Sequence, residues 1–237
     1  MQLLDIPFDD RRRRYLMFHT RDLPERLVLS QTTTTAAFEA VGSSRFFVSQ
    51  DGRILAKVVP DKFSKTLEPF KWLARDYLEK RWLAQSDARK EYLSMRILKR
   101  AGLRAPRFHG WGLSLNPLNK NASLLLMERV QDATAGEALF LEQEDESARI
   151  ALLETIGKDV LRLARAGYLH RDLHLNNLLV TPTGTLIWID AHLRPMPSNS
   201  RRRLGALLSS LSTRKLQGER YRTWLADYLT KHWEAGA

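Results

Sequence analysis

Residues 168–190 read YLHRDLHLNNLLVTPTGTLIWID, and this stretch decides the fold of the 237-residue chain. It holds a polar loop with Asp172 and Asn177, a short apolar strand, a Thr-Pro-Thr-Gly turn, and a second apolar strand that ends at Asp190. A tight hairpin returns its second strand to the point where the first began. We therefore expect the oxygen-bearing side chains of Asp172, Asn177 and Asp190 to converge.

These three side chains suit two different chemical roles. The amide of Asn177 and the carboxylate of Asp190 suit Mg²⁺, which proteins bind through few oxygen ligands together with substrate phosphates. Asp172 is then free to accept the proton of an acceptor hydroxyl. The pattern His170-Arg171-Asp172, followed by Asn177, resembles the catalytic loop of protein kinases. It predicts phosphoryl transfer from a nucleotide to an alcohol.

A second signal is Lys57, which stands in the apolar strand pattern of residues 54–59. Burying its ammonium group is costly without a partner. Glu91 lies in an apolar stripe of a predicted helix, so its carboxylate likewise needs a cation. Because a strand Lys in kinases reaches the phosphates and pairs with a helix Glu, we expect Lys57 to pair with Glu91. The alternatives are Arg89 or Lys90 as partners of Glu91, and Glu79 or Glu68 as partners of Lys57.

The nucleotide-covering loop is the least defined part of the pattern. Gly42, Ser43 and Ser44 are the candidates, because small residues let backbone N–H groups approach a phosphate. An ordinary turn explains the same residues equally well. Met127-Glu128-Arg129 ends a predicted buried strand, and in a kinase that segment, here with Glu128, is the hinge whose backbone meets adenine.

The remaining pattern predicts an α+β protein. Strands are expected at 32–35, 45–49, 53–59 and 124–127, and helices at 66–83, 86–102, 146–166 and 221–232. We expect a β-rich N-lobe over 1–130 with a helical insert at 60–86. The C-lobe, 131–237, is expected to be mostly helical and to carry the catalytic loop and the metal-binding hairpin.

The composition narrows the chemistry and the partners. The chain has no cysteine, which excludes a disulfide framework, a thiolate nucleophile and Cys-based metal sites. His170 and His174 are spaced like a zinc pair, but the Glu of a His-Glu-x-x-His motif is missing. The net charge of +11 favours a polyanionic partner, such as nucleic acid, anionic lipid or a phosphorylated substrate. No nucleic-acid-binding module is recognisable, so we expect no nucleic-acid partner.

The basic and aromatic segments bear on where the protein works. Arg11–Arg14 reads most simply as a solvated charged face, with contact to an anion as the alternative. No apolar run approaches the length of a membrane span, and the N-terminus does not read as a secretory signal, so we expect a cytoplasmic protein. The Trp and basic residues of the insert suit a membrane interface that holds a glycolipid. The alternative is that the insert packs on the N-lobe.

Together these residues resemble the lipopolysaccharide core kinases, the heptose/Kdo kinase family of the protein-kinase-like superfamily. The resemblance rests on Lys57, Glu91, the catalytic-loop pattern with Asn177, and Asp190-Ala191-His192, which is similar to the Asp-x-His pattern of that family. It implies a small two-lobed protein-kinase-like fold with a shortened C-lobe. It also implies ATP- and Mg²⁺-dependent phosphorylation of an inner-core sugar, a heptose.

The resemblance implies a location and a set of site residues as well. The location is the anionic cytoplasmic face of the inner membrane, where the protein would be peripheral, with the lipopolysaccharide glycolipid as its partner and no obligate protein partner. The implied catalytic residues are Asp172, Lys57 and Glu91; the implied nucleotide-binding residues are Lys57, Gly42, Ser43, Ser44 and Glu128; the implied metal ligands are Asn177 and Asp190.

Other functions stay open. A kinase for a protein, as in RIO-type kinases, or for an aminoglycoside- or choline-like molecule would share this core, although those relatives more often carry Gly where Arg171 stands. The stretch after Asp190 is short and lacks Ala-Pro-Glu, which argues against a peptide acceptor. A pseudokinase or a basic binding module is the remaining alternative. His174 and His192 fit the lining of an acceptor site and, equally well, a role as polar neighbours.

Overall fold

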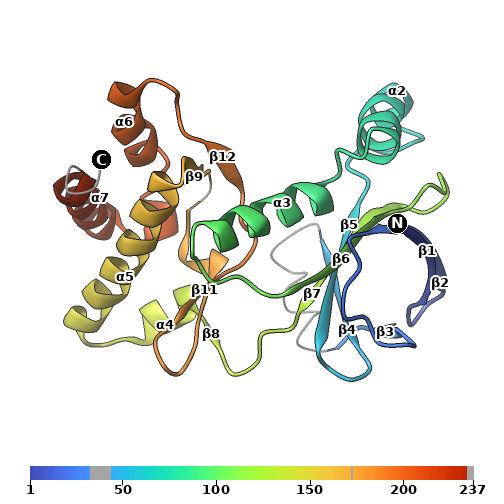
Figure 1. Ribbon diagram of the computed structural model, residues 1–237, viewed down its shortest axis with the longest axis horizontal. Helices are drawn as coiled ribbons and strands as arrows, with labels where there is room; N and C mark the ends of the chain where they lie inside the picture. Colours follow the sequence, from blue (N-terminus) through green and yellow to red (C-terminus); the bar gives the residue numbers. More distant parts are fainter. Residues whose placement is uncertain (33–43, 172, 234–237) are drawn as a thin grey trace. The chain divides into compact units, whose positions relative to one another are not determined.

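The computed structural model describes residues 1–32, 44–171 and 173–233 (Figure 1). The chain forms two compact units: the first comprises 1–93 and 106–130, and the second comprises 94–105 and 131–237. The first unit is built mainly of strands and the second mainly of helices. The predicted α+β class, with a β-rich N-lobe and a mostly helical C-lobe, is confirmed.

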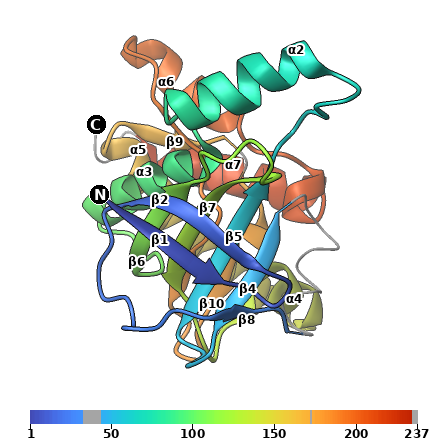
Figure 2. The same ribbon diagram turned by 90° about the vertical axis from the view of Figure 1, so that its right-hand side faces the viewer.

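The first unit is built on one curled antiparallel sheet of seven strands, several of which face the viewer in Figure 2. In spatial order they are β1 (Gln2–Pro7), β2 (Arg12–Phe18), β6 (Phe108–Leu113), β7 (Asn121–Glu128), β5 (Ile54–Pro60), β4 (Arg45–Ser49) and β3 (Leu29–Ser30). A bridge between Phe8 and Leu29 links the two edges of the sheet. The sheet therefore curls around an apolar core, to which Phe8, Met17, Phe47 and Leu126 contribute.

Strand β2 departs from the sequence prediction. Burial alternates along it, so Arg12 and Arg14 are exposed while Arg13 points inward and is 4% exposed. The Arg13 guanidinium lies 2.5 Å from the Asp10 carboxylate and 4.5 Å from the centre of the Phe8 ring, and these contacts offset part of its lost hydration. The expectation of a solvated face over Arg11–Arg14 is therefore wrong for Arg13.

The predicted strands 45–49 and 53–59 are confirmed as β4 and β5, and 124–127 is confirmed within β7. The predicted strand at 32–35 falls almost wholly outside the described residues. The predicted helix 66–83 is present as α2 (Pro69–Lys71) followed by the π-helix η1 (Trp72–Trp82). This α2–η1 segment projects beyond the end of β5 in Figures 1 and 2. Helix α3 (Asp87–Arg100) follows and continues into the second unit.

The second unit packs helices around two small sheets. Its helices are α4 (Gly136–Glu142), α5 (Glu146–Arg165), α6 (Arg203–Leu208) and α7 (Glu219–Trp233), with 3-10 turns η2 (Leu175–Asn177), η3 (Ser200–Arg202) and η4 (Arg214–Leu216). One sheet orders β11 (Leu186–Trp188), β10 (Leu178–Val180) and β8 (Thr134–Ala135), and the other pairs β12 (Leu193–Pro195) with β9 (Tyr168–His170). Helix α5 starts where predicted, because the Asp145 carboxylate accepts from the Ser147 N–H at 2.9 Å. No helix within the described ranges combines the length and apolarity needed to cross a membrane.

Tyr15 gives the first unit a pH-sensitive core. Burial raises the pKa of its phenol to about 12, against the lowering effects of the Asn119 amide and the Arg13 charge. A phenol whose pKa is higher in the folded than in the unfolded state stabilises the fold at neutral pH. It loses that contribution as the pH rises from the unfolded value through the folded one.

We predict that Tyr15→Phe flattens the alkaline loss of stability. Between about pH 9 and about pH 11 the wild-type protein should lose about 1.4 kcal/mol more unfolding free energy than Tyr15→Phe, from the linkage of this one phenol. Urea unfolding of both proteins at the two pH values measures this difference. Equal losses in the two proteins would contradict the proposed ionisation.

Candidate active site

The hairpin of the second unit brings Asn177 next to Asp190. Strands β10 and β11 pair in antiparallel register, with Leu178 opposite Trp188 and Val180 opposite Leu186. The pairing continues one step further, because the Ile189 N–H donates to the Asn177 carbonyl at 2.9 Å. Asn177 therefore lies opposite the residue that precedes Asp190, as the hairpin spacing predicts.

The turn that carries Asn177 is held by neighbouring backbone and side chains. The Asn177 N–H donates to the His174 carbonyl at 3.0 Å, and the Asn176 N–H donates to His174 Nδ1 at 3.0 Å. The Asn176 amide also donates to the Glu137 carboxylate at the start of α4. A Cβ at Gly136 would lie only 2.8 Å from the Leu175 carbonyl, so the missing side chain lets α4 approach this turn.

The loop before the hairpin is tied to the residues that follow Asp190. Leu193 pairs with His170 between β12 and β9, and the Arg171 N–H donates to the His192 carbonyl at 2.8 Å. Asp172 itself lies outside the described residues. Asp190 has φ of +48°, a left-handed conformation in which Asp and Asn are enriched among residues other than glycine.

The histidines of this region have distinct environments. Burial lowers the pKa of His170 to about 4, with a smaller lowering from the charge of His192, so its imidazole is neutral at neutral pH. Its ring centre lies 5.7 Å from the Trp188 ring, and His192 Nε2 lies 3.9 Å from the Asp190 carboxylate. In the part of the chain that the structure describes, no three His, Cys, Asp or Glu side chains are grouped so as to hold a metal.

Trp188 anchors the second strand of the hairpin, a role that sequence reasoning missed. The side chain is fully buried, and its indole N–H donates to the Asp159 carboxylate on α5 at 2.9 Å. Burial raises the pKa of Asp159 even though this hydrogen bond acts against it. The Trp188 N–H donates to the Arg104 carbonyl at 2.8 Å. The sequence signal that could have revealed this role is a single Trp in the predicted strand together with an Asp in the apolar pattern of the predicted helix 146–166.

The first unit pairs Lys57 with Glu91. Lys57 Nζ on β5 lies 2.9 Å from Glu91 Oε2 on α3, and the two side chains are only 10% and 8% exposed. Competing carboxylates are engaged elsewhere, since Glu68 pairs with Lys71 and Glu79 with Arg75. The structure thus brings together Lys57 and Glu91, the two charged residues that each stand in an apolar pattern of the sequence.

The other predicted nucleotide contacts are less defined. Gly42 and Ser43 lie outside the described residues, and Ser44 is a half-buried residue just before β4. Glu128 is exposed at the end of β7, where its carboxylate accepts from the Arg107 N–H at 2.8 Å. Its own N–H donates to the Arg107 carbonyl at 2.7 Å. The Glu128 N–H is therefore already used within the first unit.

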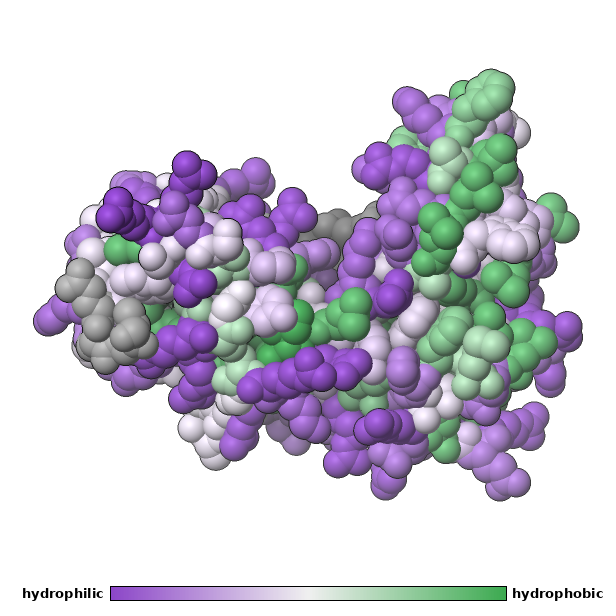
Figure 3. All heavy atoms as spheres, turned by 45° about the horizontal axis from the view of Figure 1, so that its top comes forward, coloured by the Kyte–Doolittle hydropathy of each residue, from purple (hydrophilic) through white to green (hydrophobic). Residues whose placement is uncertain are grey.

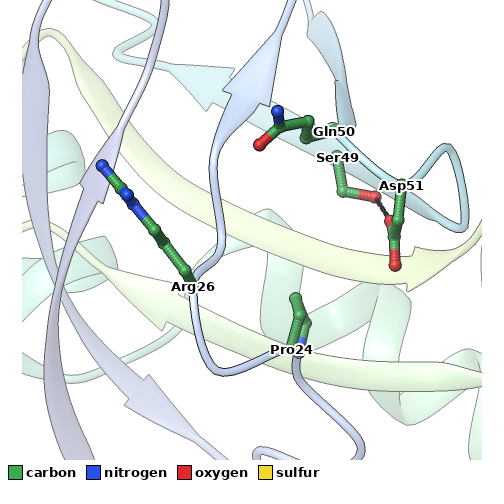
Figure 4. Close-up of a pocket in the computed structure, with 5 residues that line it drawn as sticks. All are labelled: Pro24, Arg26, Ser49, Gln50 and Asp51. Carbon is green, nitrogen blue, oxygen red and sulfur yellow. Dashed lines mark hydrogen bonds between the residues drawn. The ribbon is translucent and has the colours of Figure 1, made fainter.

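A hollow of about 230 Å³ in the first unit contains none of the predicted site residues. It is lined by Pro24, Arg26, Ser49, Gln50 and Asp51, as Figure 4 shows. The Ser49 hydroxyl donates to the Asp51 carboxylate at 2.5 Å, which lowers the pKa of Asp51. These contacts shape the turn between β4 and β5.

Each unit, taken by itself, holds side chains of a defined chemical kind. The first offers an ammonium group held by a carboxylate, the arrangement that positions a Lys for phosphate oxygens. The second offers an amide and a carboxylate from one hairpin, which are hard oxygen donors. This donor set fits Mg²⁺, which takes one or two protein oxygens and completes its shell with phosphate and water.

We predict that removing one partner of the Lys57–Glu91 pair destabilises the protein strongly. Glu91→Ala should cost about 3–5 kcal/mol of unfolding free energy, because it leaves a buried ammonium without its carboxylate. The double variant Lys57→Met/Glu91→Leu should regain most of that loss, since two apolar side chains replace the pair. Denaturant unfolding of Glu91→Leu, Lys57→Met and the double variant measures the coupling, and strictly additive losses would contradict it.

Comparisons with known proteins bear on the family and the fold of the chain. The sequence profile of the lipopolysaccharide kinase (Kdo/WaaP) family matches residues 68–217. No curated protein matches the chain in sequence. A solved structure of WaaP in complex with acyl carrier protein is similar at a TM-score of 0.52 and 18% identity, covering 84% of this chain and 82% of that one. A structure of the bifunctional kinase-methyltransferase WbdD reaches a TM-score of 0.46 at 17% identity, covering 86% of this chain and 45% of that one.

At such low identity the likeness to WaaP concerns the fold, and it confirms the expected kinase-like class. The profile match carries the family assignment. It spans more than half of the chain and includes Glu91, the catalytic-loop pattern, Asn177 and Asp190, while Lys57 lies just before it. The chain therefore belongs to the lipopolysaccharide kinase (Kdo/WaaP) family.

Proposed function

We propose that the chain is an ATP-dependent kinase that phosphorylates a sugar hydroxyl, a heptose, of the lipopolysaccharide inner core. The observation that supports this most is the backbone hydrogen bond between Ile189 and Asn177, which sets Asn177 opposite the residue before Asp190, shortly after the His170-Arg171-Asp172 pattern. Membership of a lipopolysaccharide kinase family supports the reaction class and the substrate class.

The proposed roles follow from the charges of the side chains. Lys57, held by Glu91, binds phosphate oxygens of ATP, and the carboxylate keeps the ammonium charged and oriented. Asn177 and Asp190 hold Mg²⁺, which when bound neutralises part of the negative charge on the phosphates. Ser44, with Gly42 and Ser43, covers the phosphates, and the backbone near Glu128 meets the base.

In the proposed step a sugar hydroxyl attacks the terminal phosphorus of ATP. A bond forms between the hydroxyl oxygen and that phosphorus, and the bond from the phosphorus to the bridging oxygen breaks, so ADP leaves with the electron pair. Asp172 orients the hydroxyl and accepts its proton. The neutral His170 beneath this loop contributes packing and carries no charge at neutral pH.

The family and the charge of the chain support the proposed acceptor class. Inner-core sugars stand among carboxylates and phosphates, which a chain of net charge +11 attracts at low salt. Arg11, Arg12 and Arg14, together with Arg201 and Arg202, are exposed and are candidates for this attraction. Because the glycolipid is held in a membrane, we place the enzyme at the cytoplasmic face of the inner membrane.

We predict that the purified protein transfers label from terminally radiolabelled ATP, with Mg²⁺, to dephosphorylated core oligosaccharide. Asp190→Asn should lower the turnover by about 100-fold or more, because it removes a metal-binding charge while Asn still tolerates the left-handed backbone of this position. Asp227→Asn, an exposed substitution on α7, is the matched control and should keep full activity.

The unfolding midpoint of each variant shows whether a loss of activity reflects a loss of fold. Wild-type turnover in a folded Asp190→Asn variant would contradict the metal assignment. Transfer to a protein or to an aminoglycoside, with none to the oligosaccharide, would replace the acceptor proposed above. Absence of ATP binding would favour a pseudokinase.

A further inference from the structure

The α2–η1 segment is amphipathic, but its charged side is buried and its apolar side is exposed. The only buried residues of η1 are Asp76 and Arg81, which are charged. The large apolar side chains of this region are exposed: Leu67 (84%), Phe70 (86%), Leu73 (45%), Leu78 (46%), Trp82 (69%) and Leu83 (64%). We call these six residues the apolar face. Figure 3 shows apolar side chains gathered over this projecting segment, at the upper right.

Hydrogen bonds fix the charged side inward. The Arg81 guanidinium donates to Asp61 at 2.7 Å, to the Ser114 carbonyl at 2.8 Å and to the Asn119 carbonyl at 2.9 Å. These contacts join η1 to the start of the insert and to the loop between β6 and β7. Turning the helix to bury its apolar face would leave the guanidinium without these partners.

Asp76 locks the same orientation from the other side. Its carboxylate accepts from the Phe63 N–H at 2.7 Å and pairs with Lys80 at 2.9 Å. Burial pushes the pKa of Asp76 upward, but the hydrogen bonds from Phe63, Lys62 and Lys80 outweigh burial and hold the pKa below its ordinary value. The exposure of the apolar face is therefore built into the fold of the first unit. The insert thus packs on the N-lobe through its charged side, while its apolar side chains remain exposed.

The carboxylates of Glu68 and Glu79 beside the apolar face are paired with Lys71 and Arg75, whereas two further lysines lie over aromatic rings. Lys65 Nζ lies 4.6 Å from the centre of the Trp72 ring, and Lys62 Nζ lies 5.7 Å from that of Phe63. Within the described ranges, neither lysine has a carboxylate at salt-bridge distance. The chain as a whole carries a net charge of +11.

We infer that the apolar face, flanked by Lys62 and Lys65, is the element with which this protein inserts into an anionic lipid surface. Exposed Leu, Phe and Trp side chains with neighbouring lysines are what an interfacial helix presents to a bilayer, where the apolar chains enter the acyl boundary and the ammonium groups meet the headgroup phosphates. A second copy of the chain is disfavoured as the occupant, because the same lysines would face each other. This inference rests on the proposed function in one respect, because a kinase that acts on a membrane-held glycolipid must reach a membrane surface.

Flotation with vesicles free of lipopolysaccharide tests this inference separately from catalysis. We expect the wild-type protein to bind vesicles of phosphatidylglycerol and phosphatidylcholine. The variant Leu67→Ser/Phe70→Ser/Trp82→Ser should lose about tenfold or more of that binding while keeping its unfolding midpoint, because all three side chains are exposed. The control Leu3→Ser/Leu141→Ser removes exposed leucines elsewhere and should bind as the wild type does.

Charge is tested by Lys62→Gln/Lys65→Gln, which should weaken binding to the anionic vesicles and reduce its salt dependence. Equal binding by the wild type and the triple serine variant would overturn the inference, as would a wild type that binds no vesicles. A wild-type dimer that the triple variant converts to monomer, without vesicle binding, would assign the face to a second copy instead. The triple variant should still phosphorylate a soluble oligosaccharide, so failure of the docking inference is distinguishable from failure of the proposed reaction.

Discussion

A charge that is removed from water must have a partner, and this requirement organises the first unit. Lys57 on β5 is paired with Glu91 on α3, which holds the helix against the sheet. The Arg81–Asp61 ion pair fixes the orientation of η1. The Arg13–Asp10 ion pair allows the charged strand β2 to lie next to the edge strand of the curled sheet. Each of these charges would be costly to bury alone, and its ion-pair partner offsets part of that cost. The positions of α3 and of the insert thus follow from ion pairs as much as from apolar packing.

The second unit depends on a local constraint, the short hairpin of β10 and β11. Because its register is fixed and Trp188 is buried with its indole bound to Asp159, the strand end at Asp190 has little freedom. The hydrogen bond from the Ile189 N–H to the Asn177 carbonyl then fixes the turn before the hairpin against the end of the second strand. An enzyme that positions phosphates gains from such rigidity, since catalysis of phosphoryl transfer is mostly positioning and electrostatic stabilisation.

The parts of the structure that sequence reasoning predicted are those set by short-range pattern. The hairpin follows from its turn and its spacing, and the Lys57–Glu91 pair follows from two charges that each lie in an apolar pattern. Strand β6, in contrast, reads Phe-His-Gly-Trp-Gly-Leu, and its two glycines hide the strand signal. In β2 the run of arginines hides the alternation, because Arg13 is buried through a partner and a ring that only the fold supplies. The inverted orientation of η1 could not be predicted, since an apolar stripe ordinarily marks the buried face of a helix.

The central claim is that this chain phosphorylates a sugar of the lipopolysaccharide inner core, and mass spectrometry of that core tests it most directly. Core oligosaccharide would be prepared from the source strain, from a strain lacking this gene, and from that strain complemented with the wild-type or the Asp190→Asn gene. The account predicts that the deletion removes the mass of one phosphate from the core, that the wild-type gene restores it, and that Asp190→Asn does not. A core of unchanged phosphate content in the deletion strain would contradict the account.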